Sequence, residues 1–386
     1  MKARERTILG QPSWIVESDQ VELAVTEWGG HMAPVIFFRK SGRPAQPYYI
    51  SPWQGKNVRT GVPVLDPLRG DFFCMPFGAG NAYRGEDHSV HGESAGARWT
   101  LSGVFRNEKV TELRLRMSTK VRRGRVTKRL FLVDRQNAVY IQHVLEGYEG
   151  RMCLSHHATL AVPEQPGSLR VSTGPIRFGM VPPRNVLSND GPEYYALSPG
   201  KRFAAIGRVP TIWMDMPFQD CATHPRSMGF MDLIAIFARP GATPSWIAAA
   251  VPASGYLWYA LKDPLVLPQT VFWMDNHGRH APPWSGGNRC LGLEDGRAYF
   301  ADGLANSARK NELNAAGIPT VFTLKREKPV LINYIQGVVR IPRSFDRVKS
   351  AVFGRDTVRF TAWSGKRVET AVHWNFLYSG ELGLDR

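Results

Sequence analysis

The sequence has few of the features that mark metal, redox or membrane proteins. Its four cysteines, Cys74, Cys153, Cys221 and Cys290, lie far apart, so no pair has the spacing of a zinc knuckle or a redox motif. No stretch approaches the roughly 20 apolar residues that a membrane span needs. No apolar run long enough for a signal peptide follows the first six residues. We therefore expect reduced thiols, no membrane association and a cytoplasmic protein.

Motifs for nucleotides, activated serines and metals are also missing. The chain has no GxSxG elbow and no P-loop, and residues 78–80 are not followed by the remainder of a dinucleotide fingerprint. His156 and His157 are neighbours that would point to opposite faces of a strand, which disfavours joint binding of one ion. His277 and His280 have no third ligand at a suitable spacing. The sequence thus predicts chemistry without a cofactor and without a metal.

Acidic residues are scarce relative to basic ones. The 386 residues include 49 Lys and Arg against 33 Asp and Glu, a formal net charge of +16. Such a surface attracts nucleic acid, anionic membranes or acidic and phosphorylated substrates. The excess concentrates in residues 106–135, where the arginines alternate with apolar residues in the manner of a hairpin with one solvated face. Because no nucleic-acid module is recognisable, the sequence disfavours nucleic acid as a partner.

Helical periodicity is scarce, and only residues 304–316 predict a helix, which Gly317 would end. Glycine and proline, at 37 and 28 residues, instead punctuate many short apolar runs. Hydrophobic residues make up 43% of the chain, enough for a substantial core. Alternating patterns predict strands at residues 21–25, 32–38, 113–117, 126–133, 139–145, 234–238, 246–251, 257–261, 320–324 and 330–335.

Two further segments complete the expected organisation. Residues 163–200 are rich in Pro, Gly and Ser and predict a long loop, whereas residues 345–380 alternate again and predict late strands. Many short strands with frequent turns are typical of an all-β sandwich or barrel. We therefore predict an all-β protein with a single domain over residues 1–386, in which residues 345–386 form a C-terminal β extension.

Two residues stand out as candidates for proton transfer. Glu294 ends an apolar, strand-like segment, where partial desolvation would raise its pKa toward that of a general base. The structural alternative is an ion pair with Arg289 or Arg297, which is the commoner use of such a residue. His157 follows a predicted strand, and histidine is the natural proton donor near neutral pH. Its alternative role is that of a hydrogen-bonded histidine at a strand end.

Three residues are candidates for holding a ligand. Arg69 could hold a sugar hydroxyl or a phosphate through its planar fork, unless it pairs with a neighbouring aspartate. His91 precedes a glycine in a glycine-rich loop, which would let the backbone approach a ligand closely. Trp273 could stack on a sugar ring, although a tryptophan in a large β protein is more often part of the core.

Taken in order along the chain, these segments resemble the galactose mutarotase-like superfamily, in particular the aldose 1-epimerase and hexose-phosphate mutarotase branch. Residues 28–32 are similar to its early Gly-Gly turn, and residues 69–78 to its Arg-Gly signature with Cys-x-Pro-x-Phe-Gly. Residues 91–99 resemble its His-Gly and Trp continuation, and residues 157–160 match the position of its histidine element. Residues 273–294 resemble its closing pattern of a tryptophan followed by Cys-x-Glu.

The resemblance implies a β supersandwich of two large antiparallel sheets and a metal-independent isomerase acting on a small-molecule carbohydrate. It implies that Glu294 removes the proton of the anomeric hydroxyl and that His157 protonates the ring oxygen, so that the ring opens and recloses on its other face. The positive net charge predicts a phosphorylated or acidic sugar. The resemblance makes four other residues candidates for substrate binding: Arg69, His91, Trp273 and Asp275.

Other functions on the same fold stay open. A non-catalytic carbohydrate-binding protein, a lyase or a hydrolase could share this architecture, because fold does not determine function. A hydrolase would need a second carboxylate about 5–10 Å from Glu294. Asp275 and Asp295 are the candidates, although Asp295 is adjacent to Glu294 along the strand and would point away from it.

Overall fold

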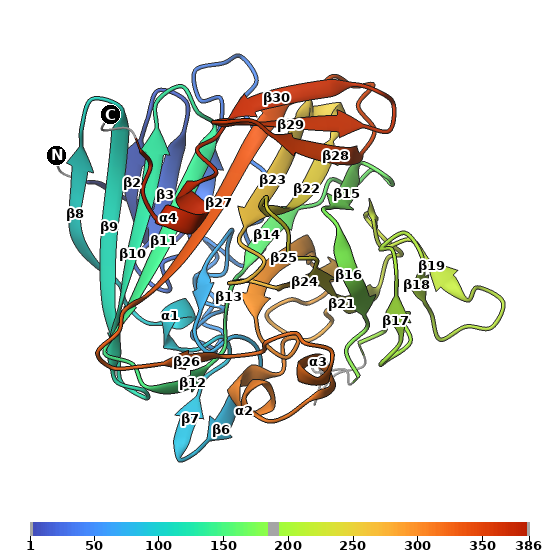
Figure 1. Ribbon diagram of the computed structural model, residues 1–386, viewed down its shortest axis with the longest axis horizontal. Coiled ribbons are helices and arrows are strands. Elements are labelled where there is room, and N and C mark those ends of the chain that lie inside the picture. The colour runs from blue at the N-terminus through green and yellow to red at the C-terminus, as the bar shows by residue number, and fades with distance from the viewer. Residues whose placement is uncertain (1–2, 184–192, 384–386) are drawn as a thin grey trace.

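The computed structural model describes residues 3–183 and 193–383, and it is mostly β, with 49% of residues in strands and 6% in helices (Figure 1). Two large antiparallel sheets dominate the molecule. This arrangement confirms the prediction of an all-β protein built on two large antiparallel sheets.

The first large sheet has nine strands, and its longest members lie at its centre. In spatial order the strands are β20 (Thr223–His224), β15 (Leu169–Thr173), β22 (Ser245–Val251), β23 (Tyr256–Lys262), β27 (Val330–Arg340), β11 (Ala138–Glu146), β10 (Gly124–Val133), β9 (Val110–Thr119) and β8 (Thr100–Arg106). Sequence neighbours pair as hairpins, whereas β27 inserts between β23 and β11 and so joins distant parts of the chain.

The second large sheet has eight strands and carries the candidate site. Its path is β17 (Arg202–Phe203), β16 (Ile176–Met180), β21 (Phe230–Ala238), β24 (Gln269–Asn276), β25 (Arg289–Arg297), β13 (Leu154–His156) and β5 (Phe73–Cys74), and β14 (Ala158–Ala161) also pairs with β25. Strand β25 therefore lies between β24 on one side and the interrupted pair β13 and β14 on the other.

Smaller sheets and short helices complete the chain. The small sheets consist of β1 (Arg4–Ile8), β2 (Gln11–Glu17), β3 (Glu22–Thr26) and β4 (Met32–Ile36); β28 (Val348–Phe353), β29 (Thr357–Ala362) and β30 (Arg367–Ala371); β12 (Gly150–Met152) and β26 (Phe322–Leu324); β18 (Val209–Pro210) and β19 (Phe218–Gln219); and β6 (Asn81–Tyr83) and β7 (Glu86–His88). The helices are α1 (Glu93–Gly96), α2 (Gly303–Ala308), α3 (Glu312–Ala315), α4 (Phe376–Ser379) and the 3₁₀ turn Pro252–Ser254.

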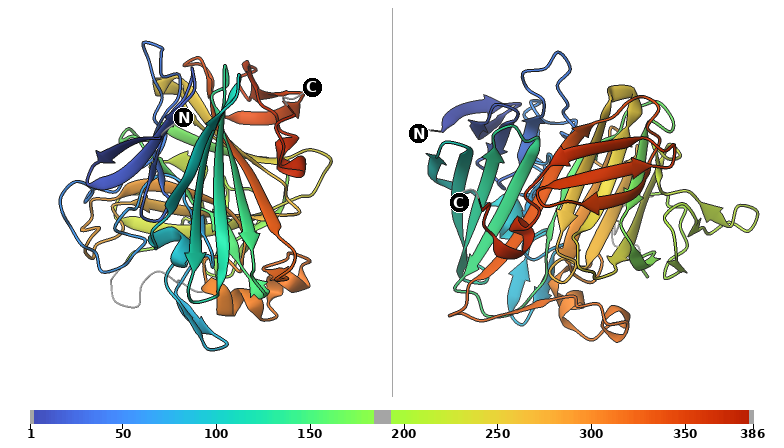
Figure 2. Two further views of the ribbon diagram at one scale, coloured as in Figure 1. Left: turned by 90° about the vertical axis from the view of Figure 1, so that its left-hand side faces the viewer. Right: turned by 45° about the horizontal axis from the view of Figure 1, so that its top comes forward.

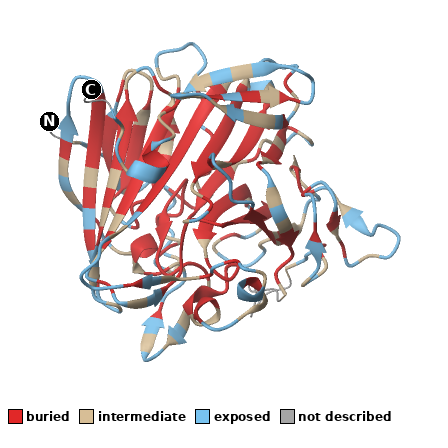
Figure 3. Cartoon of the chain, viewed as in Figure 1, coloured by how far each residue is buried: buried red, intermediate tan, exposed pale blue. Residues whose placement is uncertain are grey.

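The central strands of the nine-stranded sheet are buried on both faces, as the red strands in Figure 3 show. In β23, Trp258 and Ala260 belong to the core shared with the eight-stranded sheet, whereas Leu257, Tyr259 and Leu261 belong to a second core. The β28–β30 sheet covers that second core (Figure 2). Because a strand alternates its faces, a strand buried on both sides is apolar along most of its length, which agrees with the sequence of β23 up to Lys262.

Two local predictions were wrong. The predicted helix over residues 304–316 is two short helices. The first, α2, ends at Ala308, where Arg309 turns to an extended conformation, and Asn311 caps the second, α3, by accepting a hydrogen bond from the Asn314 backbone amide at 3.0 Å. The predicted loop over residues 163–200 contains strands β15 and β16, each of which pairs within a large sheet. Residues 184–192 of that loop lie outside the described part of the chain.

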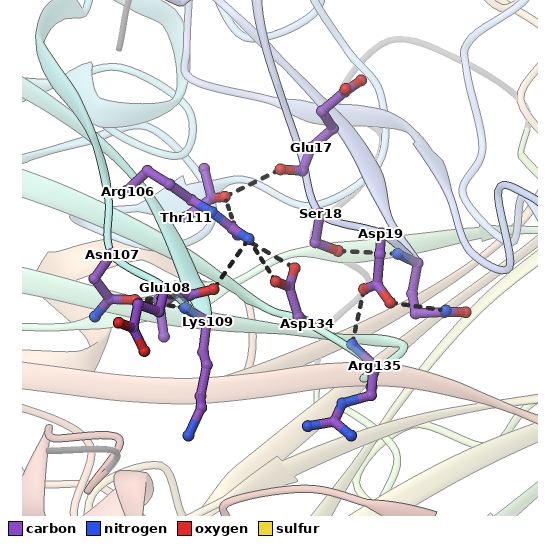
Figure 4. A network of polar contacts seen from close by, with 12 residues as sticks. Glu17, Ser18, Asp19, Arg106, Asn107, Glu108, Lys109, Thr111, Asp134 and Arg135 are labelled. Atoms are coloured by element: carbon purple, nitrogen blue, oxygen red, sulfur yellow. Dashed lines mark hydrogen bonds and ion pairs between the residues drawn. The ribbon is translucent and has the colours of Figure 1, made fainter.

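Much of the basic charge in residues 106–135 is paired within the protein. Arg114 and Arg129 both contact Glu112, at 2.8 and 2.7 Å. Figure 4 shows Arg106 bound to Asp134 and, at 2.9 Å, to the hydroxyl of Thr111. The predicted hairpin is β9 and β10, and its arginines are therefore a paired, half-solvated face. Over the residues described, no helix is both long and apolar enough to cross a membrane.

Candidate active site

Glu294 and His157, which are 137 positions apart in the sequence, meet on the eight-stranded sheet. Glu294 lies on β25, and His157 is the one residue that separates β13 from β14, both of which pair with β25. The two side chains are 3% and 5% exposed, and the His157 Nε2 atom is 3.2 Å from the Glu294 Oε1 atom. The sheet thus places a carboxyl and an imidazole in direct contact in a nearly dry environment.

The His157 ring is fixed on both its edge and its face. The Nδ1 atom lies 3.1 Å from the hydroxyl of Thr159, and the backbone amide donates to the carbonyl of Phe72 at 2.9 Å. The Phe72 ring stacks on the imidazole with centroids 4.4 Å apart, and His31 stacks on the other face of Phe72 at 4.1 Å. These contacts leave Nε2 as the ring nitrogen that faces Glu294.

Burial sets the protonation of the pair. It raises the pKa of Glu294 well above its ordinary value and lowers the pKa of His157 well below its ordinary value, the latter with help from nearby His91 and His31. Both shifts favour the uncharged forms, so the pair holds one proton in total and Glu294 carries it in the resting state. A couple with one mobile proton can accept a proton from one oxygen of a ligand and give a proton to another.

Two polar atoms beside the pair lack hydrogen-bond partners among the residues that the structure describes. The His91 ring meets the His157 ring edge to face, with centroids 4.9 Å apart, and its buried Nδ1 atom has no hydrogen bond. The Trp273 ring lies 6.0 Å from the His157 ring, and its buried Nε1–H has no acceptor. Buried polar groups are rarely left unpaired, so these two atoms are available to the hydroxyl groups of a ligand.

The backbone at His91 and Gly92 adopts positive φ angles. His91 has a φ of 59°, an uncommon conformation for a residue with a side chain. Gly92 follows with a φ of 73°, and a Cβ atom there would lie 2.1 Å from the carbonyl oxygen of Met75. Strained residues of this kind cluster at functional sites, where the surrounding structure holds them in place.

Gly292 makes room for the Glu294 carboxylate, because residues two apart on a strand share a face. A Cβ atom at Gly292 would lie 2.6 Å from Glu294 Oε1 and 3.0 Å from Trp273 Cβ. We expect Gly292→Ala to keep the fold but to displace the carboxylate and lower turnover by about tenfold or more, measured as the rate of the sugar anomer interconversion that the sequence resemblance implies. The matched control is Gly241→Ala, since a Cβ atom there meets nothing within 4 Å.

The other two substrate-binding candidates are engaged with the protein itself. The buried Arg69 guanidinium donates to the carbonyl of Ile8 at 3.0 Å and to the side chain of Gln54, so these contacts occupy the fork that was predicted to hold a sugar. Asp275 accepts hydrogen bonds from the Gly278 amide at 2.8 Å and from the Asn288 side chain. Burial raises the pKa of Asp275, and these two donors oppose that shift. The side chains of Arg69 and Asp275 thus stabilise the protein structure around the site through these hydrogen bonds.

Four residues at the site were not singled out from the sequence. Thr159 and Phe72 orient His157, and of these Thr159 carried a usable signal, because it lies two positions beyond His157 on the same side of a strand. Trp284 packs edge to face on Trp273 with centroids 5.5 Å apart, and Arg279 lies 4.9 Å above the Trp284 ring. Trp284 and Arg279 come from a loop whose sequence pattern does not indicate where it folds.

The two adjacent histidines have different surroundings. His157 faces Glu294, whereas the ring of His156 stacks on Tyr334 with centroids 4.2 Å apart, and its Nδ1 atom lies 3.4 Å from Asp71 Oδ2. The described residues contain no group of three or more His, Cys, Asp or Glu side chains arranged to hold a metal ion.

Comparison with known proteins gives matches to solved structures. No protein-family model and no curated protein matches the sequence. A candidate aldose 1-epimerase from Escherichia coli K12 superposes with a TM-score of 0.56 at 12% identity, covering 85% of this chain and 99% of the other. A candidate mutarotase from Salmonella typhimurium gives 0.57 at 14% identity, covering 88% and 94%. A candidate aldose 1-epimerase from Klebsiella pneumoniae gives 0.58 at 12% identity, covering 86% and 80%.

Proposed function

From the galactose mutarotase-like fold that this chain shares with those structures, we propose that the protein is an aldose 1-epimerase-like isomerase. The observation that carries the proposal is the 3.2 Å contact between His157 Nε2 and Glu294 Oε1, from separate segments of one sheet. Interconversion of anomers needs one group to take the proton of the anomeric hydroxyl and another to protonate the ring oxygen. The buried pair, with its single shared proton, has both capacities.

The proposed reaction proceeds in two symmetrical halves. The proton that the pair shares first moves from Glu294 to His157. Glu294 then accepts the anomeric proton while His157 gives its proton to the ring oxygen, and the bond between that oxygen and the anomeric carbon breaks. The aldehyde end rotates, and the reverse transfers close the ring on its other face. His91 Nδ1 and Trp273 Nε1–H, which have no hydrogen-bond partner in the described part of the chain, hydrogen-bond the sugar's oxygens and keep it in place.

A ligand must displace part of the present packing to reach the pair, because both side chains are nearly fully buried. The aromatic rings nearest the pair are those of Phe72, His91 and Trp273, and Trp284 packs against Trp273 from outside. Outward movement of Trp273 and Trp284 would admit a sugar ring and let it stack. Closure over the bound sugar would then exclude water from the proton transfers.

The contacts of the nearby carboxylates favour an isomerase over a hydrolase. A glycosidase needs a second carboxylate free to act near the first. Asp275 is held by Gly278 and Asn288, and Asp295 is held by Lys262 and Thr270. A free aldose with a reactive anomeric hydroxyl needs only the acid–base couple.

The proposal is tested by NMR exchange spectroscopy of anomeric protons in a panel of free aldoses. We expect the protein to raise the exchange rate of at least one sugar above its spontaneous rate, and the Glu294→Gln variant to fail to do so. Failure of the wild-type protein to accelerate any neutral, acidic or phosphorylated aldose would overturn the assignment. Sugar binding without acceleration would support the alternative of a non-catalytic carbohydrate-binding protein.

We further propose that the preferred sugar is acidic or phosphorylated and that Arg279 recognises its charge. Arg279 acts on the site electrostatically, since it contributes, after burial, to lowering the pKa of His91 to about 4. Its Nε atom is 3.6 Å from Glu193, too far for a good hydrogen bond, so a sugar anion could replace that carboxylate.

We expect a phosphorylated aldose to react with a higher kcat/KM than its neutral parent, and Arg279→Gln to reduce that advantage by about 10- to 100-fold, as for loss of a charged hydrogen bond. The measurement is the ratio of the two kcat/KM values at low ionic strength. Arg289→Gln is the control, because Arg289 pairs with the exposed Glu164. An unchanged ratio in Arg279→Gln would refute this role.

A further inference from the structure

A groove separate from the acid–base pair is formed by the turn between β1 and β2, by Trp28 after β3, and by residues 53–66. It encloses about 750 Å³. Its volume falls within the range of small-molecule sites, about 300–1,000 Å³. None of His157, Glu294, His91 and Trp273 lines it. The groove therefore presents a second concave surface that the proposed reaction does not use.

Two tryptophans line this groove, one of them exposed and the other buried. Trp28 is 47% exposed, while its backbone is fixed because its carbonyl accepts a hydrogen bond from the Thr26 hydroxyl at 2.6 Å. Trp53 is 4% exposed, and its Nε1–H donates to the carbonyl of Leu65 at 2.9 Å. The Trp53 ring is thus buried and held in place, whereas the Trp28 ring is half exposed on a fixed backbone. Rigid aromatic surfaces of this kind present apolar area at a low entropic cost.

Buried contacts hold the walls of the groove in place. Arg69, which is fully buried, donates to the carbonyl of Ile8 at 3.0 Å and to the side chain of Gln54, and so ties the β1–β2 turn to residues 53–66. Gln11 and Gln54 both donate to the carbonyl of Asp66, at 3.1 and 2.7 Å. Because these hydrogen bonds hold the segments that form the groove, the groove is preformed, which lowers the cost of binding.

The polar lining of the groove suits a neutral, hydroxyl-rich ligand. Asn57 and Arg59 are exposed in it, and within the described chain Arg59 has no ion pair. Asp66 also lines the groove and has one oxygen bound to the amide and hydroxyl of Thr60, at 2.9 and 2.8 Å. One cation and one anion balance each other, which disfavours a strongly charged ligand. Planar amide, guanidinium and carboxylate groups beside aromatic faces match the hydroxyls and the C–H faces of sugar rings.

We propose that this groove is a second saccharide-binding site, which takes a neutral oligosaccharide stacked on the exposed ring of Trp28 and hydrogen-bonded by Asn57, Arg59 and Asp66. The site is independent of the proposed isomerase activity. One structural link to the acid–base pair is aromatic: Trp53 packs edge to face on Trp284 with centroids 4.7 Å apart, and Trp284 contacts Trp273.

The proposal is tested by fluorine NMR of protein labelled with 5-fluorotryptophan, in which the Trp28 resonance is assigned through Trp28→Phe. The probes are maltotriose, cellotriose and laminaritriose as neutral trisaccharides, trigalacturonate as an anionic one, and a proline-rich peptide. We expect at least one neutral trisaccharide to shift the Trp28 resonance. We expect Trp28→Ala and Arg59→Ala each to weaken its affinity about tenfold or more, as for loss of a central aromatic or arginine contact.

Two control variants show whether binding is specific to this groove. Trp363→Ala removes a tryptophan that is 59% exposed and lies next to β29, outside the groove, and it should leave affinity unchanged. Glu294→Gln should abolish isomerase activity and leave the Trp28 shift intact, so failure of one proposal is distinguishable from failure of the other. The groove proposal is overturned if no neutral trisaccharide shifts Trp28, if only the anionic sugar or the peptide does, or if Trp28→Ala binds as well as wild type.

Discussion

Replacing Glu294 by glutamine should lower the rate of anomer exchange by about 10²–10⁴-fold, the usual contribution of a positioned acid–base group. Glutamine keeps the size of the side chain and can still donate a hydrogen bond to His157 Nε2, but it cannot accept the anomeric proton. Polarimetry on the sugar identified by the exchange panel measures the loss. The matched control is Glu164→Gln, whose side chain is 83% exposed and contacts Arg289 at the surface.

The same variant tests the protonation of the pair through its stability. Burial holds the pKa of Glu294 above its ordinary value of 4.5, so the folded state keeps this proton when the unfolded state has lost it. This contribution to stability is complete below the unfolded pKa and is lost as the pH rises through the folded pKa. Glu294→Gln removes the titration, and we expect the variant to gain stability over wild type as the pH rises.

Urea unfolding of both proteins at about pH 5 and about pH 9 measures that difference. The expected result is a difference in unfolding free energy that moves in favour of the variant at the higher pH. His157 titrates in the opposite sense, since its lowered pKa costs the folded state stability as the pH falls below 6.5, and it is present in both proteins. Full activity in Glu294→Gln would remove the carboxylate from the mechanism, even if the stability result held.

The sequence supplied the two residues of the pair because their signals are local. Glu294 stands in an apolar strand, and His157 follows a strand-like segment in a motif whose order along the chain is informative. The contact between them depends on β13 and β14 both pairing with β25, a long-range arrangement that residue spacing does not encode. The resemblance, rather than the periodicity, brought these two segments together.

Arg69 shows what the sequence could not reveal. Its neighbours in the sequence suggested that it binds a ligand or pairs with an aspartate. Its guanidinium instead donates hydrogen bonds to the carbonyl of Ile8, 61 positions earlier, and to the side chain of Gln54. The direction of a buried side chain depends on which backbone it meets, and that follows from tertiary packing. In the same way, short strands such as β15 and β16 are hidden in a segment whose Gly and Pro content is typical of a loop.

Asp295→Asn should destabilise the protein by about 3–5 kcal/mol, the typical cost of breaking a buried ion pair from one side. Asp295 follows Glu294 on β25 and therefore points to the opposite face, into the core. There it contacts the Lys262 ammonium, and it accepts a hydrogen bond from the Tyr334 hydroxyl at 2.6 Å. Loss of the carboxylate leaves a buried ammonium without its counter-charge, and chemical denaturation measures the change in unfolding free energy.

The decisive comparison is with the double variant Lys262→Met/Asp295→Asn. Removing both charges leaves no unpaired ion, so we expect the double variant to recover most of the lost stability. If Asp295→Asn alone were as stable as wild type, the buried pair would not be ionised and this account of the core would be wrong. The expected outcomes for adjacent residues are thus opposite: loss of the Glu294 charge removes activity with the fold retained, and loss of the Asp295 charge weakens the fold without touching the acid–base pair. The alternation of a single strand, β25, accounts for both.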